Sequence, residues 1–461
     1  MDQSFTKVKK RRELLARTKK QFNKFVFPSI GAMWFFSLYN MVDGAFVGKG
    51  VGANALAGVN ISMPFISFLF ALTILISVGS SNLIAFHRGK GEKDLANKYF
   101  TQSILLISVL GLVLGLLAFF NLDRLIGFLG GDQATFSYVS DYLGLISPFS
   151  VFFMLSYNLE ILVKADGFPK LSVWLGIVCS LLNIILDYIF VIVFDFGIRG
   201  AALATVIVQV LGSGVYLFHF ISPKSNLKFS SLSFNLPKIF KVIKMGVPEA
   251  LTELSIGFTT FIYNFTIMKN LGSSYITTYS IIMYVNNLVV NTMIAINQGA
   301  QPLVSFYRGR ENSSSLRELA NLMLRTALSF GVFFFVICSV FSKNIVGIFI
   351  DQANGQLFYY SVSKLKIFSF AFIISGLSIV ISGYLTASKH PNAGLVISLL
   401  RGYISISLAL FLLTRVFGPD YIWLATIVSE LISLVFGLYI SFRSLDLRSN
   451  IFHLASQFRI F

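Results

Sequence analysis

The chain has 461 residues, of which 55% are hydrophobic and only 12% are charged, and its mean hydropathy is +0.76. A soluble domain carries about 25% charged residues, so this composition excludes a soluble enzyme and predicts a helical membrane protein. The formal charge of +17 does not require a nucleic acid partner, because membrane proteins collect Lys and Arg on their cytoplasmic loops. Cys179 and Cys338 lie far apart in apolar runs, so no disulfide and no cysteine-based metal site is expected.

The chain opens with a basic tail, residues 1–24, which contains nine Lys or Arg. The apolar stretch after it is too long for the core of a signal peptide and predicts the first membrane span. A membrane helix needs about 20 apolar residues, and runs of this length predict twelve spans in all. They cover residues 25–47, 57–86, 100–120, 138–164, 170–194, 198–221, 239–268, 274–306, 319–341, 357–387, 392–416 and 420–442. The run 57–86 fits one long helix or one helix with a loop.

Twelve spans place both termini on the same side of the membrane. With the termini inside, 28 Lys and Arg lie in inner segments and eight in outer loops. This bias predicts that both termini are cytoplasmic. The loops are short, and neither the linker 222–238 nor the tail 443–461 leaves room for a soluble domain.

The sequence contains an internal repeat. A displacement of 220 residues aligns Pro28 with Pro248 and Gly79 with Gly299, and the displacement drifts by only two residues over the rest of the half. Such self-similarity indicates that two copies of one structural unit follow each other along the chain.

The repeat predicts an N-lobe at 25–221 and a C-lobe at 239–442, each with six spans of the same orientation. The expected fold is therefore an all-α integral membrane protein whose twelve transmembrane helices form two pseudo-two-fold related lobes, as in several transporters. This symmetry favours a carrier over a channel, because channels more often assemble a pore from identical subunits.

Carboxylates inside the predicted spans are the main functional signal, since a charge in the hydrocarbon region costs at least about 2.5 kcal/mol. Asp43 shares a helix face with Tyr39, Asp187 shares one with Asn183, and Thr205 falls at a similar depth. These oxygens suit a hard cation such as Na+, and two close carboxylates can instead hold a proton. Hydrogen bonding between helices is the competing explanation, above all for Asn183 and Thr205.

The second half lacks these carboxylates. The residue equivalent to Asp43 is Tyr263, and the residue equivalent to Asp187 is Leu408 or Ala409. A purely architectural role would be expected in both halves, so the N-lobe is predicted to be the ion-coupled one. A membrane scaffold or receptor would have no need of carboxylates confined to one repeat.

Other polar residues in the spans give weaker signals. Glu253 and Glu430 could line a cavity from the second half or only bond neighbouring helices. Glu160 and Lys164, at i and i+4, predict a local ion pair. Arg401 is the only base placed deep in a span. No Walker motif and no nucleophile–base arrangement occurs in the sequence, so neither an ATP-driven pump nor an enzyme is predicted.

Several motifs together resemble one family. The segments 42–48, 183–187, 200–205 and 298–305 are similar to motifs in the first, fifth, sixth and eighth helices of the multidrug and toxic compound extrusion (MATE) family, in its prokaryotic type. The resemblance covers nearly the whole chain, with the same number of spans and the same repeat. It implies a monomeric, multi-pass protein of the inner cell membrane, in which two lobes alternate access to a central cavity.

The resemblance also implies a function and a site. Members export organic cations or other toxic compounds against H+ or Na+ entry, with no further cofactor. Their N-lobe cation site matches Asp43, Asn183, Asp187 and Thr205, with Tyr39 and Tyr142 at nearby polar positions and Gln298 in the eighth-helix motif. Many members carry a glutamate eight residues after the proline of the seventh helix, where this chain has Ile256, and Glu253 stands at proline plus five. A lipid-linked oligosaccharide flippase of the same superfamily is the alternative function.

Overall fold

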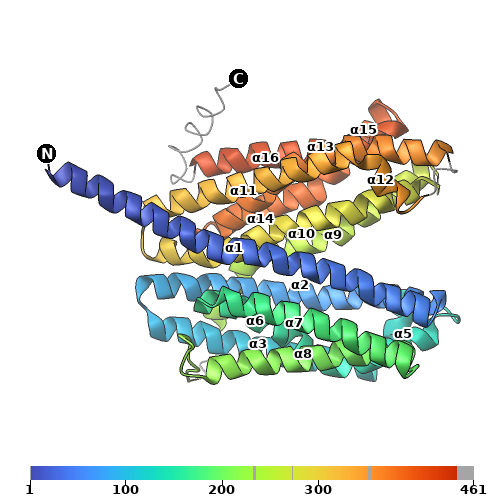
Figure 1. Ribbon diagram of the computed structural model, residues 1–461, viewed down its shortest axis with the longest axis horizontal. Coiled ribbons are helices and arrows are strands. Elements are labelled where there is room, and N and C mark those ends of the chain that lie inside the picture. The colour runs from blue at the N-terminus through green and yellow to red at the C-terminus, as the bar shows by residue number, and fades with distance from the viewer. Residues whose placement is uncertain (1, 232–234, 273, 351–354, 444–461) are drawn as a thin grey trace. The chain divides into compact units, whose positions relative to one another are not determined.

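The computed structural model describes residues 2–231, 235–272, 274–350 and 355–443, and the regular elements in these ranges are all helical (Figure 1). They form two compact units. The N-unit is Pro28–Gly246, and the C-unit combines the chain before Pro28 with the chain from Val247 onward. The sequence placed the lobe boundaries at 25 and 239, so the unit boundaries lie a few residues further along and fall inside two helices.

The helices follow one another with short connections. The N-unit contains α2 (Ala53–Lys90), α3 (Lys93–Phe120), α4 (Leu122–Leu129), α5 (Phe136–Ile146), α6 (Ser150–Asp166), α7 (Pro169–Asp187) and α8 (Ile198–Ile221). The C-unit contains α10 (Ser274–Gly309), α11 (Ser313–Val340), α12 (Ser342–Gly347), α13 (Gly355–Ala387), α14 (Pro391–Leu399), α15 (Ser405–Val416) and α16 (Ala425–Arg443). Two long helices, α1 (Asp2–Gly50) and α9 (Leu236–Asn270), begin in one unit and end in the other.

All twelve predicted spans fall on helical segments. In the described part of the chain, ten segments are long and apolar enough to cross a membrane, and α1 and α9 are not among them. The run 57–86 lies within one unbroken helix, α2, which ends at Gly91 in the left-handed conformation (φ 85°) that glycine adopts readily. The predicted outer loop 48–52 is shorter than expected, because α1 continues to Gly50.

Three spans depart from a regular α-helix. Pro148 lies in a short 3₁₀ turn, Ser147–Phe149, that separates α5 from α6. A π-helical segment, Tyr188–Val193, directly follows α7, and another, Leu400–Ile404, lies between α14 and α15. Such π-helical segments are rare and occur mostly at functional sites. Asp187 precedes the first of them and Arg401 belongs to the second.

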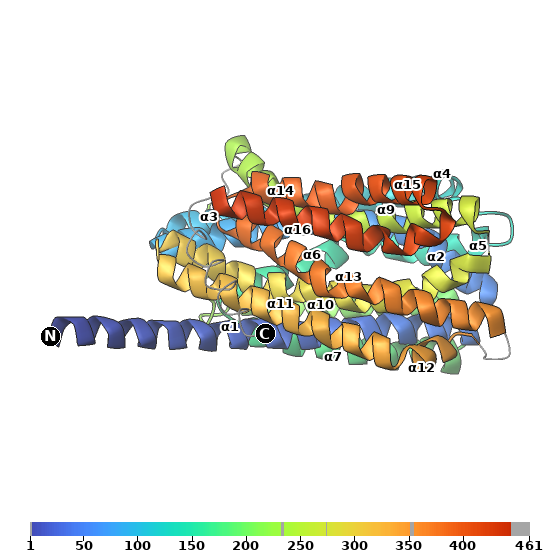
Figure 2. The same ribbon diagram turned by 90° about the horizontal axis from the view of Figure 1, so that it is seen from above.

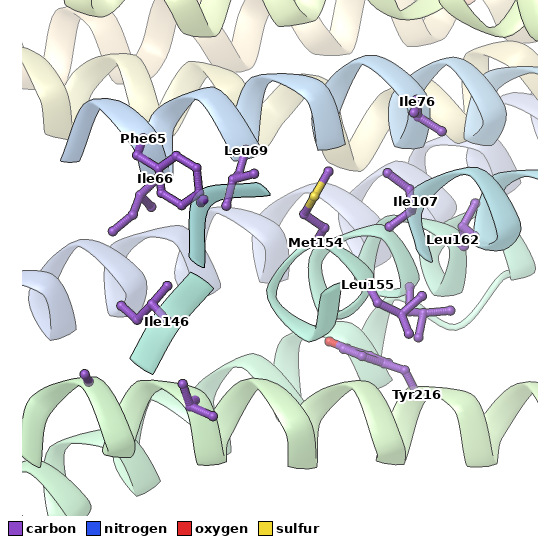
Figure 3. Close-up of a cluster of buried hydrophobic side chains, with 14 of the residues drawn as sticks. Phe65, Ile66, Leu69, Ile76, Ile107, Ile146, Met154, Leu155, Leu162 and Tyr216 are labelled. Carbon is purple, nitrogen blue, oxygen red and sulfur yellow. The ribbon is translucent and has the colours of Figure 1, made fainter. Parts of the chain in front are cut away.

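The core of the N-unit is apolar and built mainly from α2, α3, α5, α6 and α8 (Figure 3). Leu69, Ile107, Met154 and Leu162 have no exposed surface. The outward faces are apolar as well, since α3 exposes a series of valine and leucine side chains between residues 109 and 117. A helix that is apolar on all sides is typical of a membrane environment, where helices associate by close packing.

The repeat is visible in how the units are packed. In the N-unit α2 packs against α3 and α6, and in the C-unit α10 packs against α11 and α13. A Cβ atom at Gly79 of α2 would lie 2.1 Å from the carbonyl oxygen of Val242 on α9, and one at Gly299 of α10 would lie 2.8 Å from Cα of Val26 on α1. The aligned glycines therefore allow equivalent close helix crossings, each within its own unit.

The predicted basic tail is largely helical and continuous with the first span. Figure 2 shows α1 as one long helix whose first turns reach past the ends of α10 and α11. The Thr18 hydroxyl lies 3.1 Å from that of Ser315, and Tyr307 donates a 2.6 Å hydrogen bond to Gln21. Phe22 is fully buried beside these contacts. The predicted C-terminal tail 443–461 lies outside the described residues except for Arg443.

Candidate functional site

Asp43 and Asp187 lie together in the N-unit. Asp43 is on α1, Asp187 is the last residue of α7, and their carboxyl groups are close enough to interact. Asp187 has no exposed surface, whereas Asp43 is half-buried. Two carboxylates at one site in an apolar bundle repel each other unless a cation or a proton neutralises them.

The polar atoms around Asp187 lack partners. Both carboxylate oxygens of Asp187 and both amide atoms of Asn183 are buried without a hydrogen bond among the described side chains. Asn183 is 2% exposed and lies one turn before Asp187 on the same face of α7. Leaving a buried polar group unsatisfied costs about 1–3 kcal/mol, so four such atoms in one place indicate a binding site.

Other predicted residues of this site are near it in the fold but not joined to it. Thr205 is half-buried on α8, which packs against α7 and the π-helical segment after Asp187. Among the described residues, no hydrogen bond links the Thr205 hydroxyl to either carboxylate. Tyr142 is buried on α5 as part of the N-unit core. The side chain of Tyr39 lies outside the described part of the chain.

Glu253 and Gln298 belong to the C-unit and so do not adjoin the Asp43 site within one unit. Both are half-buried, on α9 and α10 respectively. One turn before Glu253, Glu249 is buried and accepts a 2.5 Å hydrogen bond from Gln301 of α10. The sequence singled out Glu253, but the carboxyl group that is tied to α10 is that of Glu249.

Arg401 is neutralised inside its span. Its Nε donates a 2.7 Å hydrogen bond to Glu430 of α16, and the side chains are 12% and 5% exposed. Glu430 also accepts a hydrogen bond from Ser378 of α13, and the Ser429 hydroxyl donates to the carbonyl oxygen of Arg401. The sequence showed both charges but not their pairing, because the two residues lie 29 positions apart.

The predicted local ion pair is confirmed. Lys164 Nζ lies 3.0 Å from Glu160 on α6, and Ser172 of α7 donates to the same carboxylate oxygen. Asp166, which the sequence assigned to a loop, is instead the last residue of α6 and is fully buried.

The C-unit fills the position that corresponds to the Asp43 site. Tyr263, equivalent to Asp43, has no exposed surface, and its hydroxyl lies 2.6 Å from that of Thr426, equivalent to Thr205. The Thr426 amide also donates to Tyr263, and the Tyr279 ring stacks on the Tyr263 ring at 4.6 Å. A satisfied aromatic cluster therefore stands where the N-unit has unsatisfied carboxylates.

The donor set around Asp187 limits what can bind there. No group of three or more His, Cys, Asp or Glu with metal-binding geometry occurs among the described residues. Two carboxylates and an amide provide oxygen ligands, which suit a hard monovalent cation or a proton. The arrangement offers no nucleophile with an adjacent base, so it can bind a cation but has no evident means of bond chemistry.

These features define a multi-pass membrane transporter built from two six-helix repeats, and not an enzyme. The chain belongs to the MatE family, whose model matches residues 28–189 and 248–411. The two matched segments begin at Pro28 and Pro248, the prolines aligned by the internal repeat.

Known proteins of this family resemble the chain over most of its length. The multidrug export protein MepA of Staphylococcus aureus strain MRSA252 is 26% identical over 411 residues, which cover 86% of this chain and 88% of MepA. MepA of Staphylococcus saprophyticus is 24% identical over 401 residues, with coverages of 86% and 87%. Among solved structures, a mutant of the Vibrio cholerae MATE transporter VcmN superposes with a TM-score of 0.86 at 18% identity, covering 95% of this chain and 98% of that one.

A second superposition gives the same fold. A multidrug resistance MATE family transporter of the MOP superfamily, solved in an outward-facing conformation, has a TM-score of 0.87 at 18% identity. It covers 94% of this chain and 97% of its own. The expected fold class and family are therefore confirmed.

Proposed function

We propose that the chain is a secondary active multidrug exporter that exchanges organic cations or other toxic compounds for H+ or Na+. It works as a monomer in the inner cell membrane with both termini in the cytoplasm, in line with the 28 to 8 distribution of basic residues. The two repeats, the family and the multidrug export proteins among its relatives support this function. No further cofactor and no nucleic acid are required.

The observation that carries the proposal is the set of unsatisfied atoms on α7. Asp187 and Asn183 present four buried polar atoms without described partners, and Asp43 adds a second carboxyl group. The internal equivalent of this site is closed by hydrogen bonds between Tyr263 and Thr426, so the open polar set is specific to the N-unit. A cation or proton would satisfy the set and neutralise the repulsion between the carboxylates.

The proposed cycle follows from this electrostatic change. When the carboxylates of Asp43 and Asp187 are both ionised, the site attracts a cationic compound or the coupling cation. Entry of H+ or Na+ from the outer side neutralises the pair and removes the attraction for the cationic compound, which leaves. The transporter then turns inward, releases the coupling ion where its concentration is lower and accepts the next compound. Thr205 on the adjacent α8 is the proposed fourth ligand.

A lipid-linked oligosaccharide flippase would need uncompensated basic residues for a diphosphate. The one base that the sequence places deep in a span, Arg401, is already paired with Glu430 at 2.7 Å. Carboxylates therefore dominate the accessible polar groups in the spans, which favours a cationic substrate over an anionic one.

The test is uptake of a fluorescent organic cation into proteoliposomes under separately imposed H+ and Na+ gradients. We expect one of the two gradients to drive uptake and Asp187→Asn to abolish the driven component. Asp195→Asn is the matched control, because Asp195 is an exposed carboxylate eight residues further on, at φ 52°, a conformation that Asn tolerates. Normal driven uptake by Asp187→Asn would refute the assigned site, and the absence of driven uptake by inserted wild-type protein would refute the exporter.

A further inference from the structure

The segment that follows α8 is fixed to the N-unit through one carboxylate. Asp166 Oδ1 accepts hydrogen bonds from the backbone N–H groups of Asn226 (3.0 Å) and Leu227 (2.9 Å). The Asn226 side chain donates to the carbonyl oxygen of Asp166 at 2.9 Å. Asp166 therefore ties the end of α6 to a segment 60 residues further along the chain.

The charge of Asp166 is compensated from two other helices. His219 Nε2 of α8 lies 3.0 Å from Asp166 Oδ2, and Arg88 Nη1 of α2 lies 3.9 Å from Oδ1. Arg88 also donates to the carbonyl oxygen of Ala165. A fully buried carboxylate is costly unless it is paired and hydrogen-bonded, and Asp166 meets both conditions.

The same segment is fixed a second time, on α3. The side chain of Asn97 accepts a 3.0 Å hydrogen bond from the Lys228 backbone, and that of Thr101 accepts one of 3.0 Å from the Ser230 backbone. Lys228 and Ser230 alternate with residues that do not bond α3, as expected for an extended stretch. We call residues 222–231 the linker, because they lead toward α9 and the C-unit.

The repeat has no second copy of this anchor. The residue equivalent to Asp166 is Ser388, whose hydroxyl donates to the carbonyl oxygen of Leu385 on its own helix. Ser388 is also buried, at 2% exposure, so the two positions share their surroundings but not their chemistry. The carboxylate belongs to the half whose chain must continue into the other unit.

We propose that Asp166 is a positioning residue for the transport cycle, which clamps the linker to the N-unit while the two units alternate. The inference rests on the proposed function for the cycle itself, but not for the clamp. Downstream of the linker, the chain leaves the N-unit inside α9, between Gly246 and Val247 and next to Pro248. A linker fixed upstream confines bending to this part of α9, where proline removes a helical hydrogen bond.

The clamp is tested first by limited trypsin digestion of the full chain in detergent. Lys224 and Lys228 have exposed side chains, but cleavage beside them requires the linker backbone to detach. Asp166→Ala is expected to speed cleavage at these lysines roughly tenfold, Asp166→Asn less, and the matched control Ser388→Ala not at all. Should Asp166→Ala fail to fold, the pair Asn97→Ala and Thr101→Val removes the anchors on α3 without uncovering a buried charge. Unchanged cleavage in folded variants would overturn the proposal.

A cross-link tests the role in transport. In a chain with Cys179→Ala and Cys338→Ala, the substitutions Asn97→Cys and Lys228→Cys allow a short bifunctional maleimide to join the linker to α3. We expect the cross-linked protein to transport at the uncross-linked rate, since the linker stays on the N-unit throughout. We also expect Asp166→Ala to lower the maximal rate with little change in KM, and the cross-link to restore that rate.

The outcomes separate the two proposals. Loss of transport on cross-linking, or no rescue of Asp166→Ala, would overturn the clamp while leaving the exporter intact. Absence of gradient-driven uptake in every form of the protein would overturn the exporter, and the cleavage rates would still decide whether Asp166 holds the linker.

Discussion

The Tyr263 hydroxyl lies 2.6 Å from the Thr426 hydroxyl, at the two positions that the internal repeat equates with Asp43 and Thr205. In one unit these positions form a closed, buried hydrogen bond supported by a stacked Tyr279 ring. In the other they belong to a site with unsatisfied carboxylate and amide atoms. Duplication thus produced two equivalent frames, of which one keeps the polar atoms available to a ligand.

Tyr263→Phe tests this asymmetry. The variant removes one hydroxyl and leaves Thr426 without that partner, so we expect a loss of about 1–3 kcal/mol in stability. Gradient-driven uptake by folded protein should be unchanged, because the C-unit position is not a cation site. Thermal unfolding in detergent and the proteoliposome assay measure the two effects. A selective loss of ion coupling would show that Tyr263 takes part in transport.

Asp187→Asn should make the protein more resistant to heat while it stops transport. At pH 8 the two carboxyl groups repel each other in a low-dielectric site, and an amide at position 187 removes this repulsion. A rise of a few degrees in Tm is expected, as is common where an active site is destabilised for function. Asp195→Asn should leave the Tm unchanged. A fall in Tm for Asp187→Asn would mean that the carboxylate stabilises the fold.

The Arg401–Glu430 pair should be strongly non-additive. Glu430→Gln leaves a buried guanidinium without its counter-charge, which costs about 3–5 kcal/mol, and Arg401→Met leaves the carboxylate unpaired at a similar cost. The double variant should be more stable than either single variant. Unfolding of all four proteins in one detergent gives the coupling energy, and simple additivity would show that the pair contributes no specific interaction.

Gly79→Ala and Gly299→Ala should both destabilise the protein. The added Cβ would meet the backbone carbonyl oxygen of Val242 at 2.1 Å, or Cα of Val26 at 2.8 Å, and backbone atoms cannot move aside as a side chain can. Overpacking of this kind costs about 1–3 kcal/mol. Gly176→Ala and Gly214→Ala are the controls, since a Cβ there meets nothing within 4 Å. Equal stability of all four variants would contradict the close crossings.

Hydropathy and self-comparison predicted the fold because they depend on composition and on period, which survive in a single sequence. They placed all twelve spans and aligned Gly79 with Gly299 before their shared role was visible. They could not locate the 3₁₀ turn at Pro148 or the π-helical segments, because local helix irregularity leaves hydropathy unchanged.

The candidate site was predicted as far as chemistry near one helix allows. Asn183 and Asp187 share a face of α7 at a spacing that the sequence shows directly, and Asp43 was inferred from the cost of a charge in the membrane. The partners of Glu430 and Asp166 could not be predicted, since those contacts join residues 29 and about 60 positions apart. Asp166 lay between two apolar runs and so was assigned to a loop.

The sharing of α1 and α9 between the units has a consequence for biosynthesis. Val26 emerges from the ribosome early, but Gly299, which it packs against, follows 273 residues later. At about 5–20 residues per second, the first turns of α1 wait roughly 15–55 s for their binding surface. The C-unit therefore cannot assemble co-translationally from its own consecutive helices. A nascent chain stopped before α10 would carry an unpaired apolar helix face, which makes that stage of synthesis the one most in need of a chaperone.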